Sequence, residues 1–274
     1  AGPTLDRIKA TQVFTVGYRP NSAPMSYEFN GQVTGYAIDV CQRIGAAIAQ
    51  QLKLPALKVR YVPVSTTERM PALFKGSIDM ECAGTTNSKS RREQMAFGLT
   101  YFYAGANLLV RDGEGITGLP GLRGKTLAVV KGTTGQLVAE AREREGGGWK
   151  TVVFDSTRAA VEALEQGKVD GVIQDDIQLL PLARKSSKKL VLAGRNLSIE
   201  PLAPMYNKND AELNSLVQSF MRQFYRDGEM AQLYDRWFMH EVPGQGYNLK
   251  LQPSALLSDN FRRPSGYVTD WVML

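Results

Sequence analysis

The chain has 274 residues, a length that suits one large domain or two of ordinary size. Its composition, 43% hydrophobic and 22% charged, is that of a globular protein, and no apolar run approaches the ~20 residues of a membrane-spanning helix. The 33 basic residues exceed the 27 acidic ones, but they lie in short scattered groups without interleaved aromatic residues, which argues against nucleic-acid binding.

The first half of the chain alternates between strand-like and helix-like segments. Residues 12–18 ("QVFTVGY") and 58–64 ("KVRYVPV") have strand composition, and between them residues 36–52 carry apolar side chains at helical spacing. A short helix over 69–75 is predicted to end at Gly76. This alternation predicts an open, largely parallel sheet with helices on both faces.

A second round of the same alternation begins at residue 124. Residues 124–145 ("GKTLAVVKGTTGQLVAEARERE") are predicted to hold a strand, a turn and a helix, and a strand, a helix and a strand follow over 152–176. The stretch "ALEQGKVDG" at 163–171 matches "ALFKGSIDM" at 72–80, because in both a helix ends at a glycine and a strand begins just after it. The chain is therefore predicted to build one α/β unit twice.

The two repeats are predicted to form two lobes, one of them discontinuous. Residues 104–111 ("AGANLLVR") and 200–208 ("EPLAPMYNK") are predicted to be the strands that cross between the lobes. Lobe one should then hold residues 1–106 and 204–274, and lobe two should hold residues 107–203.

Polar residues follow the strand predicted at 79–82. Gly84 lies eight residues beyond Gly76, and Thr86 and then Arg91 follow in a polar, turn-like segment. Ligands of open α/β sheets bind outside the carboxyl ends of the strands, and the free N–H groups of a helical turn beside an arginine suit an anion. We expect this junction to bind a carboxylate.

The second half offers a complementary junction. Asp175 lies eight residues beyond Gly167, where another strand should end, and "KGTTG" at 131–135 forms a strand-to-helix turn with further N–H groups for the carboxylate. The negative charge of Asp175, with the carbonyl of Gly84 and the hydroxyl of Thr86, suits an ammonium group. A carboxylate beside an ammonium describes an α-amino acid. Each feature alone more often belongs to an ordinary turn or cap, and their shared position at strand-to-helix junctions favours the binding hypothesis.

The cysteines and the histidine limit the chemistry. Cys41 and Cys82 leave two alternatives open, one disulfide or a pair of buried free thiols, and neither is part of a CxxC motif. With His240 they are too few for a zinc site, so neither a metal nor a cofactor is expected. The chain lacks a GxSxG motif, and His240 is predicted to be a surface or packing residue, which argues against hydrolytic chemistry.

Several stretches together carry a resemblance to a known family. They are "LDRIKATQVFTVGYRPNSAPMSY", "GYAIDVCQRI", "VPVSTTERMPALFKGSIDMECAGTTNSKSRR", "LRGKTLAVVKGTTG" and "LYDRWF". They resemble the periplasmic amino-acid-binding proteins of bacterial ABC importers, and within that family the glutamate/aspartate-binding branch. The resemblance implies a type II periplasmic-binding-protein fold, with two lobes joined by two crossing hinge strands. It also implies a monomer in the periplasm, with its signal peptide removed, that closes around one free amino acid and delivers it to a membrane permease.

The resemblance also implies a role for individual residues. It assigns the α-carboxylate to Arg91, Thr86 and Thr133, and the α-ammonium to Asp175, Thr86 and the carbonyl of Gly84. Positions that match those binding an acidic side chain are occupied here by Arg19, Thr66 and Arg69.

Three positions depart from the acidic branch. Thr157 stands where a histidine is expected, Val130 where a threonine is expected, and Gly84 where serine is common. These departures leave the α-amino-acid interpretation intact, and the preference for glutamate or aspartate is a hypothesis.

Two other functions share the same fold. One is a periplasmic enzyme such as a cyclohexadienyl-type dehydratase, which product formation from a prephenate-like acid would reveal. The other is a sensory ligand-binding domain, which a partner permease would distinguish from a transport receptor. The segment 247–274 is assigned no role.

Overall fold

The computed structural model describes residues 2–264 and 270–274, and the chain forms two compact units. The first unit comprises Ala1–Tyr103, Pro201–Gln245 and Lys250–Asp270, and the second comprises Ala104–Glu200, Gly246–Leu249 and Trp271–Leu274. The chain passes between the units after Tyr103 and after Glu200, whereas the predicted lobes change after residues 106 and 203. Two short pieces near the C-terminus group with the second unit, although the prediction gave that whole segment to lobe one.

The first unit is built on a five-stranded sheet of order β5-β1-β6-β15-β7 within the described residues. β1 (Val13–Tyr18) lies parallel to both β5 (Lys58–Pro63) and β6 (Met80–Glu81). β15 (Met205–Asn207) is antiparallel to β6 and to β7 (Met95–Phe97), so it alone of these five strands runs against the others. Because the remaining strands share one direction, their carboxyl ends meet at one edge.

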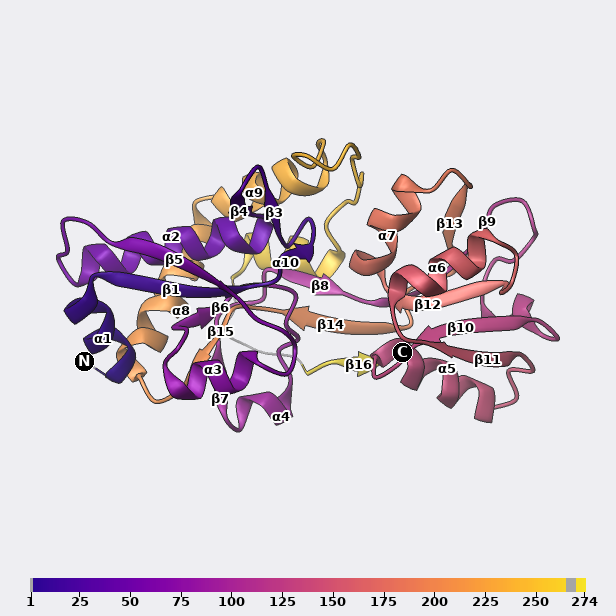
Figure 1. The fold of residues 1–274 in the computed structure, drawn as a ribbon, viewed down its shortest axis with the longest axis horizontal. Helices are drawn as coiled ribbons and strands as arrows, with labels where there is room; N and C mark the ends of the chain where they lie inside the picture. The colour runs from indigo at the N-terminus through magenta and orange to yellow at the C-terminus, as the bar shows by residue number, and fades with distance from the viewer. Residues whose placement is uncertain (1, 265–269) are drawn as a thin grey trace. The chain divides into compact units, whose positions relative to one another are not determined.

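Helices cover both faces of the first sheet, as Figure 1 shows for α2 (Tyr36–Gln51) and α3 (Arg69–Lys75). Gly45 of α2 lies so close to β1 that a Cβ there would meet Phe14 Cδ2 at 3.0 Å, which explains a glycine inside this helix. Cys41 of α2 forms a disulfide with Cys82, which follows β6 directly. The structure therefore selects the disulfide over the free thiols.

The other described elements of the first unit complete its framework. They are α1 (Pro3–Thr11), α4 (Lys89–Arg92), α8 (Ala211–Arg226), α9 (Glu229–Phe238), α10 (Ala255–Arg262) and a small antiparallel sheet of β2 (Asn21–Ser22), β3 (Ser26–Phe29) and β4 (Gln32–Thr34). β8 (Phe102–Ala104) runs from the first unit into the second. Tyr36 of α2 packs edge-on against Tyr234 and Phe238 of α9, with ring centroids 5.9 and 5.1 Å apart. These aromatic contacts fix α2 on the C-terminal helices.

The second unit repeats this plan with a sheet of order β11-β10-β12-β9-β13. Its strands are β9 (Ala106–Arg111), β10 (Thr126–Val130), β11 (Lys150–Phe154), β12 (Gly171–Asp175) and β13 (Leu190–Ala193). β10 pairs in parallel with β11 and β12, and β9 is antiparallel to β12 and β13. One strand again runs against four, so the prediction of two largely parallel sheets is confirmed.

Alternation along the strands of the second unit builds a core on each face of its sheet. Leu127 and Val129 of β10 pack in one cluster with Val138 of α5 (Thr134–Arg144). Ala128 and Val130 pack in the other, with residues of α6 (Thr157–Glu165) and α7 (Asp176–Lys185). Figure 1 shows α5 on one side of this sheet and α6 and α7 on the other. Successive side chains of β10 point to opposite faces of the sheet, and both faces are buried.

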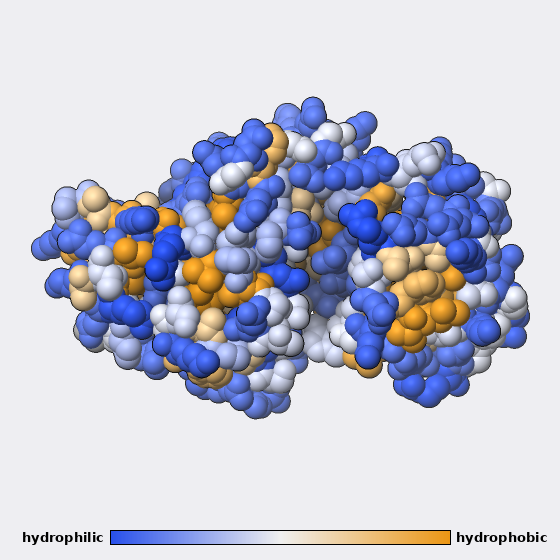
Figure 2. All heavy atoms as spheres, in the orientation of Figure 1, coloured by the Kyte–Doolittle hydropathy of each residue, from blue (hydrophilic) through white to orange (hydrophobic). Residues whose placement is uncertain are grey.

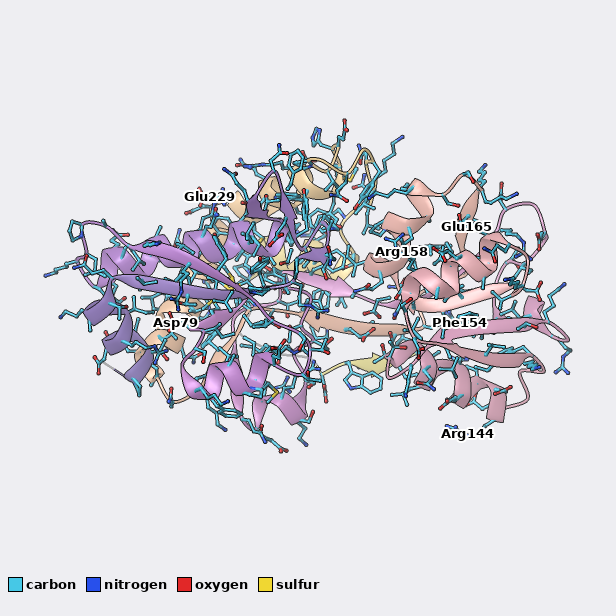
Figure 3. The ribbon with its side chains drawn as sticks, in the orientation of Figure 1. Asp79, Arg144, Phe154, Arg158, Glu165 and Glu229 are labelled. Carbon is cyan, nitrogen blue, oxygen red and sulfur yellow. A yellow bond between two sulfur atoms is a disulfide. The ribbon has the colours of Figure 1, made fainter. Side chains whose placement is uncertain are left out.

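The internal repeat extends to individual hydrogen bonds. Gly76 and Gly167 both end a helix with a left-handed φ, +75° and +74°. Asp79, labelled in Figure 3, accepts the N–H of Thr15 on β1 at 2.8 Å, and Asp170 accepts that of Thr126 on β10 at 2.9 Å. An arginine contacts each carboxylate, Arg7 at 2.6 Å and Arg111 at 3.3 Å. The predicted correspondence therefore holds at the level of side-chain chemistry.

The C-terminal end of the chain adds a strand to the second unit. β16 (Val272–Met273) pairs with β14 (Ser198–Leu202), and the N–H of Leu274 donates to the carbonyl of Leu197 at 2.9 Å. The sequence assigned no role to this segment.

The surface shown in Figure 2 is mostly polar, with separate apolar patches over each unit. Among the described helices, none combines the length and the apolar character needed to cross a membrane.

Candidate functional site

The carboxyl-terminal edge of the first sheet gathers the basic residues that the sequence singled out. β1 ends at Tyr18, so Arg19 is the first residue beyond it, and β6 ends at Glu81, so the polar turn follows there. Arg69 is the first residue of α3 and is 8% exposed. The parallel pairing of β1 with β6 places these chain segments at the same edge.

Glu81 is the centre of this group, and it is fully buried. The hydroxyl of Thr85 donates to its carboxylate, with oxygen distances of 2.6 and 2.5 Å. Arg69 Nη1 lies 3.6 Å from Glu81 Oε2 and also donates to Thr85 Oγ1 at 3.1 Å. Each of the three side chains of Glu81, Thr85 and Arg69 therefore contacts the other two through its polar atoms.

The electrostatics of Glu81 show which cations lie around it. Burial raises the pKa of Glu81, while the charge of Arg69, the hydrogen bond from Thr85 and the charges of Arg19 and Arg91 act to lower that pKa. The charges of all three predicted arginines therefore act on one buried carboxylate, and Arg69 contacts it. This carboxylate was not among the predicted site residues.

Arg91 is anchored to the turn that holds Thr86. Ser88 caps α4 by accepting the N–H of Arg91 at 3.3 Å, and Arg91 Nη1 donates to the carbonyl of Thr86 at 2.7 Å. Gly84 is exposed, and a Cβ built there would find Leu202 Cδ1 as its nearest neighbour at 3.8 Å. A serine would fit, so nothing steric requires glycine at this position.

Arg19 and Thr66 are placed by short-range structure. The backbone of Arg19 exchanges two hydrogen bonds with the hydroxyl of Ser26, at 2.9 and 2.8 Å, which ties it to β3. Thr66 is exposed in the turn before α3, where Ser65 and Glu68 bond to each other. The charge of Arg19 acts on Glu81, whereas Thr66 lies on the surface of this turn.

In the second unit the predicted turn at 131–135 lies between β10 and α5. Thr133 caps α5, because its hydroxyl accepts the N–H of Gln136 at 3.2 Å and donates to the carbonyl of Val130 at 2.6 Å. Gly132 has a φ of +75° and donates its N–H to Gln136 Oε1 at 2.9 Å. The hydroxyl of Thr133 thus serves the turn, and the side chain of Val130 belongs to the core.

Asp175 ends β12, and two more carboxyl groups lie at the same strand end. Asp176 begins α7, and Glu200 comes from β14; the two residues are 7% and 3% exposed. Thr157 is linked to this end of β12 because its hydroxyl accepts from Gln174 Nε2 at 3.0 Å. The second unit therefore presents an acidic group where the first presents a largely basic one.

The three carboxyl groups differ in the hydrogen bonds that they accept. Glu200 accepts hydroxyl hydrogen bonds from Thr134 at 2.8 Å and Ser198 at 3.0 Å, one on each oxygen. Asp176 Oδ1 accepts the N–H groups of Ile177 at 2.8 Å and Gly105 at 3.3 Å. Asp175 Oδ1 is buried without a hydrogen-bond partner.

The pKa values follow from this burial. Burial raises the pKa of Asp176 to about 7, against the backbone hydrogen bonds that lower it. Burial, and then the neighbouring charges of Glu200 and Asp176, raise the pKa of Asp175 well above its usual value. A cation placed beside Asp175 would relieve this cost.

The described residues contain no group of three or more His, Cys, Asp or Glu side chains arranged to hold a metal ion. His240 is exposed beyond the end of α9, and its Nε2 lies 2.9 Å from Asp235 Oδ2.

Comparison with known proteins assigns the chain to a family. Residues 14–240 match the profile of the bacterial extracellular solute-binding proteins, family 3. The chain belongs to this family.

Relatives of this family-3 chain cover nearly all of its length. It is 32% identical over 269 residues to the "Glutamate/aspartate import solute-binding protein" of Salmonella typhimurium, covering 97% of this chain and 89% of that one. It is 31% identical over 267 residues to the "L-glutamate/L-aspartate-binding protein" of Pseudomonas aeruginosa, covering 96% and 88%. The predicted resemblance is confirmed at the level of the family.

Solved structures show the same fold. A mutant of ArgBP from T. maritima has a TM-score of 0.69 and 27% identity, and the match covers 87% of this chain and 100% of the ArgBP chain. The ancestral amino-acid-binding protein AncCDT-1, described as a precursor of cyclohexadienyl dehydratase, has a TM-score of 0.68 and 26% identity, covering 86% and 99%. The predicted type II periplasmic-binding-protein fold is confirmed.

Two residues of this family-3 chain were missed by the sequence reasoning. Glu81 lies in the buried stretch Met80–Cys82, and Glu200 lies in a similarly buried stretch of β14. A charged residue within an otherwise apolar strand is the signal that could have found both, since an acid there must be paired or hydrogen-bonded.

Proposed function

We propose that this chain is an extracytoplasmic receptor that binds a free L-amino acid, preferring glutamate or aspartate, and delivers it to the membrane permease of an ABC importer. Two curated relatives whose matches cover more than 95% of this chain, at identities of 32% and 31%, are named as glutamate- and aspartate-binding proteins. The proposal includes a monomeric protein in the periplasm that binds one small ligand without a cofactor and returns it unchanged.

The observation that carries this proposal is the contrast in charge between matching strand ends. The first unit holds Arg19, Arg69 and Arg91 around Glu81, and the second holds Asp175 beside Asp176 and Glu200. An α-amino acid carries both charges that these groups would complement. We assign its carboxylate to Arg91, with Thr86 and Thr133, and its ammonium to Asp175, with Thr86 and the carbonyl of Gly84.

The preference for an acidic side chain follows from the arginines that match the side-chain positions of the acidic branch. Arg69 is buried beside Glu81, and the charge of Arg19 acts on the same carboxylate. Glutamate and aspartate supply two carboxylates, one for Arg91 and one for Arg19 and Arg69, with Thr66 and Thr157 as the remaining side-chain contacts we propose. A ligand with an apolar side chain would offer Arg19 and Arg69 no carboxylate, so it would lose the charge-assisted hydrogen bonds that an acidic side chain makes.

The test is a thermal-shift screen of the natural amino acids on protein stripped of ligand by unfolding and refolding. A ligand at ~100 times its dissociation constant stabilises the folded state by ~2.7 kcal/mol, which shifts the melting temperature by several degrees. We expect glutamate or aspartate to give the largest shift. The largest shift from a basic or aromatic amino acid would contradict the acidic preference, and no shift from any amino acid would contradict the receptor.

The same protein can be tested for the competing enzyme function. The AncCDT-1 neighbour is described as a precursor of a dehydratase, so a prephenate-like acid should be incubated with the protein and its products analysed. A receptor leaves the acid unchanged. Turnover would replace the receptor proposal by the dehydratase.

A further inference from the structure

Thr85 bridges Glu81 and Arg69 inside the first unit. Its hydroxyl donates its one proton to the carboxylate of Glu81, with distances of 2.6 Å to Oε1 and 2.5 Å to Oε2. A hydroxyl whose proton is already used can only accept further hydrogen bonds, and Thr85 Oγ1 accepts from Arg69 Nη1 at 3.1 Å. The direct distance from Arg69 Nη1 to Glu81 Oε2 is 3.6 Å, which is too long for a hydrogen bond. Glu81 therefore holds Arg69 through Thr85, without the two parallel hydrogen bonds of a bidentate pair.

The bridge uses one side of the Arg69 guanidinium. Of the five N–H donors of a guanidinium, those on Nε and Nη2 form a fork that matches the two oxygens of a carboxylate. Within the described chain, no group accepts a hydrogen bond from Nε or Nη2 of Arg69. Neither atom is among the buried nitrogen and oxygen atoms that lack a partner, so both reach solvent. The Nε–Nη2 fork of Arg69 is therefore open while Nη1 is held.

Thr85 and Glu81 differ from Arg69 in their exposure. Both are 0% exposed, whereas 10% of the Arg69 side chain is exposed. Of these three side chains, Arg69 is the one that a ligand can contact. The side chains of Thr85 and Glu81 can therefore affect a ligand only through their neighbours.

The backbone that carries Thr85 is fixed on both sides. The carbonyl of Ala83 accepts from the hydroxyl of Tyr101 at 2.5 Å, and the carbonyl of Thr85 accepts the N–H of Ala203 at 3.3 Å. A hydroxyl in a fixed position can orient the guanidinium before a ligand arrives. This order in the empty protein reduces the side-chain entropy that binding costs.

We propose that Thr85 and Glu81 are positioning residues, which hold Nη1 of Arg69 and thereby present its Nε–Nη2 fork to the side-chain carboxylate of the amino acid. The inference rests on the proposed function, which assigns that carboxylate to Arg19 and Arg69. A carboxylate accepts two parallel hydrogen bonds from the fork, whereas a side-chain amide has one accepting oxygen. Thr85 and Glu81 therefore contribute to the selection of an acidic side chain.

The test is isothermal titration calorimetry of stripped protein with L-glutamate. Thr85→Val removes the hydroxyl and keeps the shape of the side chain, and Thr85→Ser keeps a hydroxyl at this position. Thr15→Val is the matched control, because Thr15 is also buried and lies within β1. The Thr85→Val change is repeated in an Arg69→Met background, which shows whether its effect passes through Arg69.

Thr85→Val should weaken the binding of L-glutamate by about tenfold, because the ligand must then immobilise the guanidinium itself. Thr85→Ser should bind nearly as tightly as wild type, and Thr15→Val should bind as wild type does. In the Arg69→Met background, Thr85→Val should cause no further loss. Wild-type affinity in Thr85→Val, or an equal loss in the Arg69→Met background, would overturn the inference while the receptor stands.

NMR of the empty protein tests the positioning without a ligand. Arg69 should give separate signals for Nη1 and Nη2, because the hydrogen bond to Thr85 hinders the rotation of the guanidinium that exchanges them. The two signals should merge in Thr85→Val. One averaged signal in the wild type would overturn the inference. The failure of every amino acid to bind, with separate signals in the wild type, would instead overturn the proposed function, and with it the carboxylate proposed for the fork.

Discussion

The two units share a frame and differ in the charge that the frame presents. In both, a helix ends at a glycine and the aspartate three residues later accepts an N–H from the neighbouring strand, Asp79 in the first unit and Asp170 in the second. At the end of the strand that follows, arginine charges act on Glu81 in the first unit, and other carboxyl groups act on Asp175 in the second. The repeated hydrogen bonds fix the backbone, and the residues at the strand ends set the chemistry.

The units also differ in how their cores are held together. A disulfide between Cys41 and Cys82 ties α2 to the segment after β6 in the first unit. The second unit has no cysteine and relies on apolar clusters on both faces of its sheet. Changes that affect charge and cross-linking should therefore act on the two units differently.

The largest expected effect is on the pH dependence of stability, through the second unit. The folded-state pKa of Asp176 is raised from 3.8 to about 7, so its contribution to stability is complete below about pH 4 and is lost as the pH rises through about 7. The full shift corresponds to about 4 kcal/mol, and the raised pKa of Asp175 acts in the same direction. Urea unfolding of the empty protein should give a lower free energy of unfolding at pH 8 than at pH 5.

A matched pair of variants assigns this effect. Asp176→Asn should flatten the dependence, whereas Asp155→Asn, an exposed aspartate in the turn before α6, should leave it as in wild type. A wild-type protein that grows more stable from pH 5 to pH 8 would contradict the assignment.

The next effect is confined to the first unit. The disulfide closes a sequence separation of 41 residues, and its loss should lower the free energy of unfolding by about 3 kcal/mol. Denaturant unfolding of the Cys41→Ser/Cys82→Ser variant measures the loss. Hydrogen exchange should increase in α2 and β6 and stay as in wild type in β10 and β12. Two free thiols in the denatured, unreduced wild-type protein would show that the bond is absent.

A smaller effect comes from the same substitution made in each unit. Glu81→Gln removes the partner of the buried Arg69 and should cost about 2 kcal/mol of unfolding free energy at pH 8. Glu200→Gln removes one of several neighbouring acids and should cost little or stabilise the protein. Chemical denaturation compares the two, with Glu162→Gln as the surface control. An equal or larger loss from Glu200→Gln would break the contrast between the units.

Many of the helices and helix ends could be predicted from the sequence, because they are encoded by residues close together in the chain. The helices over Tyr36–Gln51 and Thr134–Arg144 follow from apolar spacing, and Gly76 and Gly167 end helices as their left-handed φ requires. Arg91 could be selected from its polar turn after a predicted strand, and Arg19 and Arg69 could be selected from the family resemblance. The charges of all three act on Glu81 in the structure.

The remainder depends on contacts between distant parts of the chain. Glu200 is separated from Asp175 by an entire helix and a strand, so its role follows from the return of β14 and not from spacing. The resemblance assigned Thr133 to the α-carboxylate, and only the structure shows that its hydroxyl is bonded within its own turn. The pairing of β16 with β14 likewise joins segments more than 70 residues apart. The predicted ligand contacts of these residues stay predictions.

The most direct test of the central claim, that the two units bind opposite charges of one amino acid, is calorimetric titration with L-glutamate. Stripped wild-type protein is compared with Arg91→Ala from the first unit, Asp175→Asn from the second, and Arg144→Ala, an exposed arginine at the end of α5 labelled in Figure 3. Removal of either site charge should weaken binding by about 100-fold or more, since it leaves the ligand's charge without its partner. Arg144→Ala should bind as wild type does. Affinity within about threefold of wild type in either site variant, below any loss expected for a desolvated charge pair, would contradict the claim.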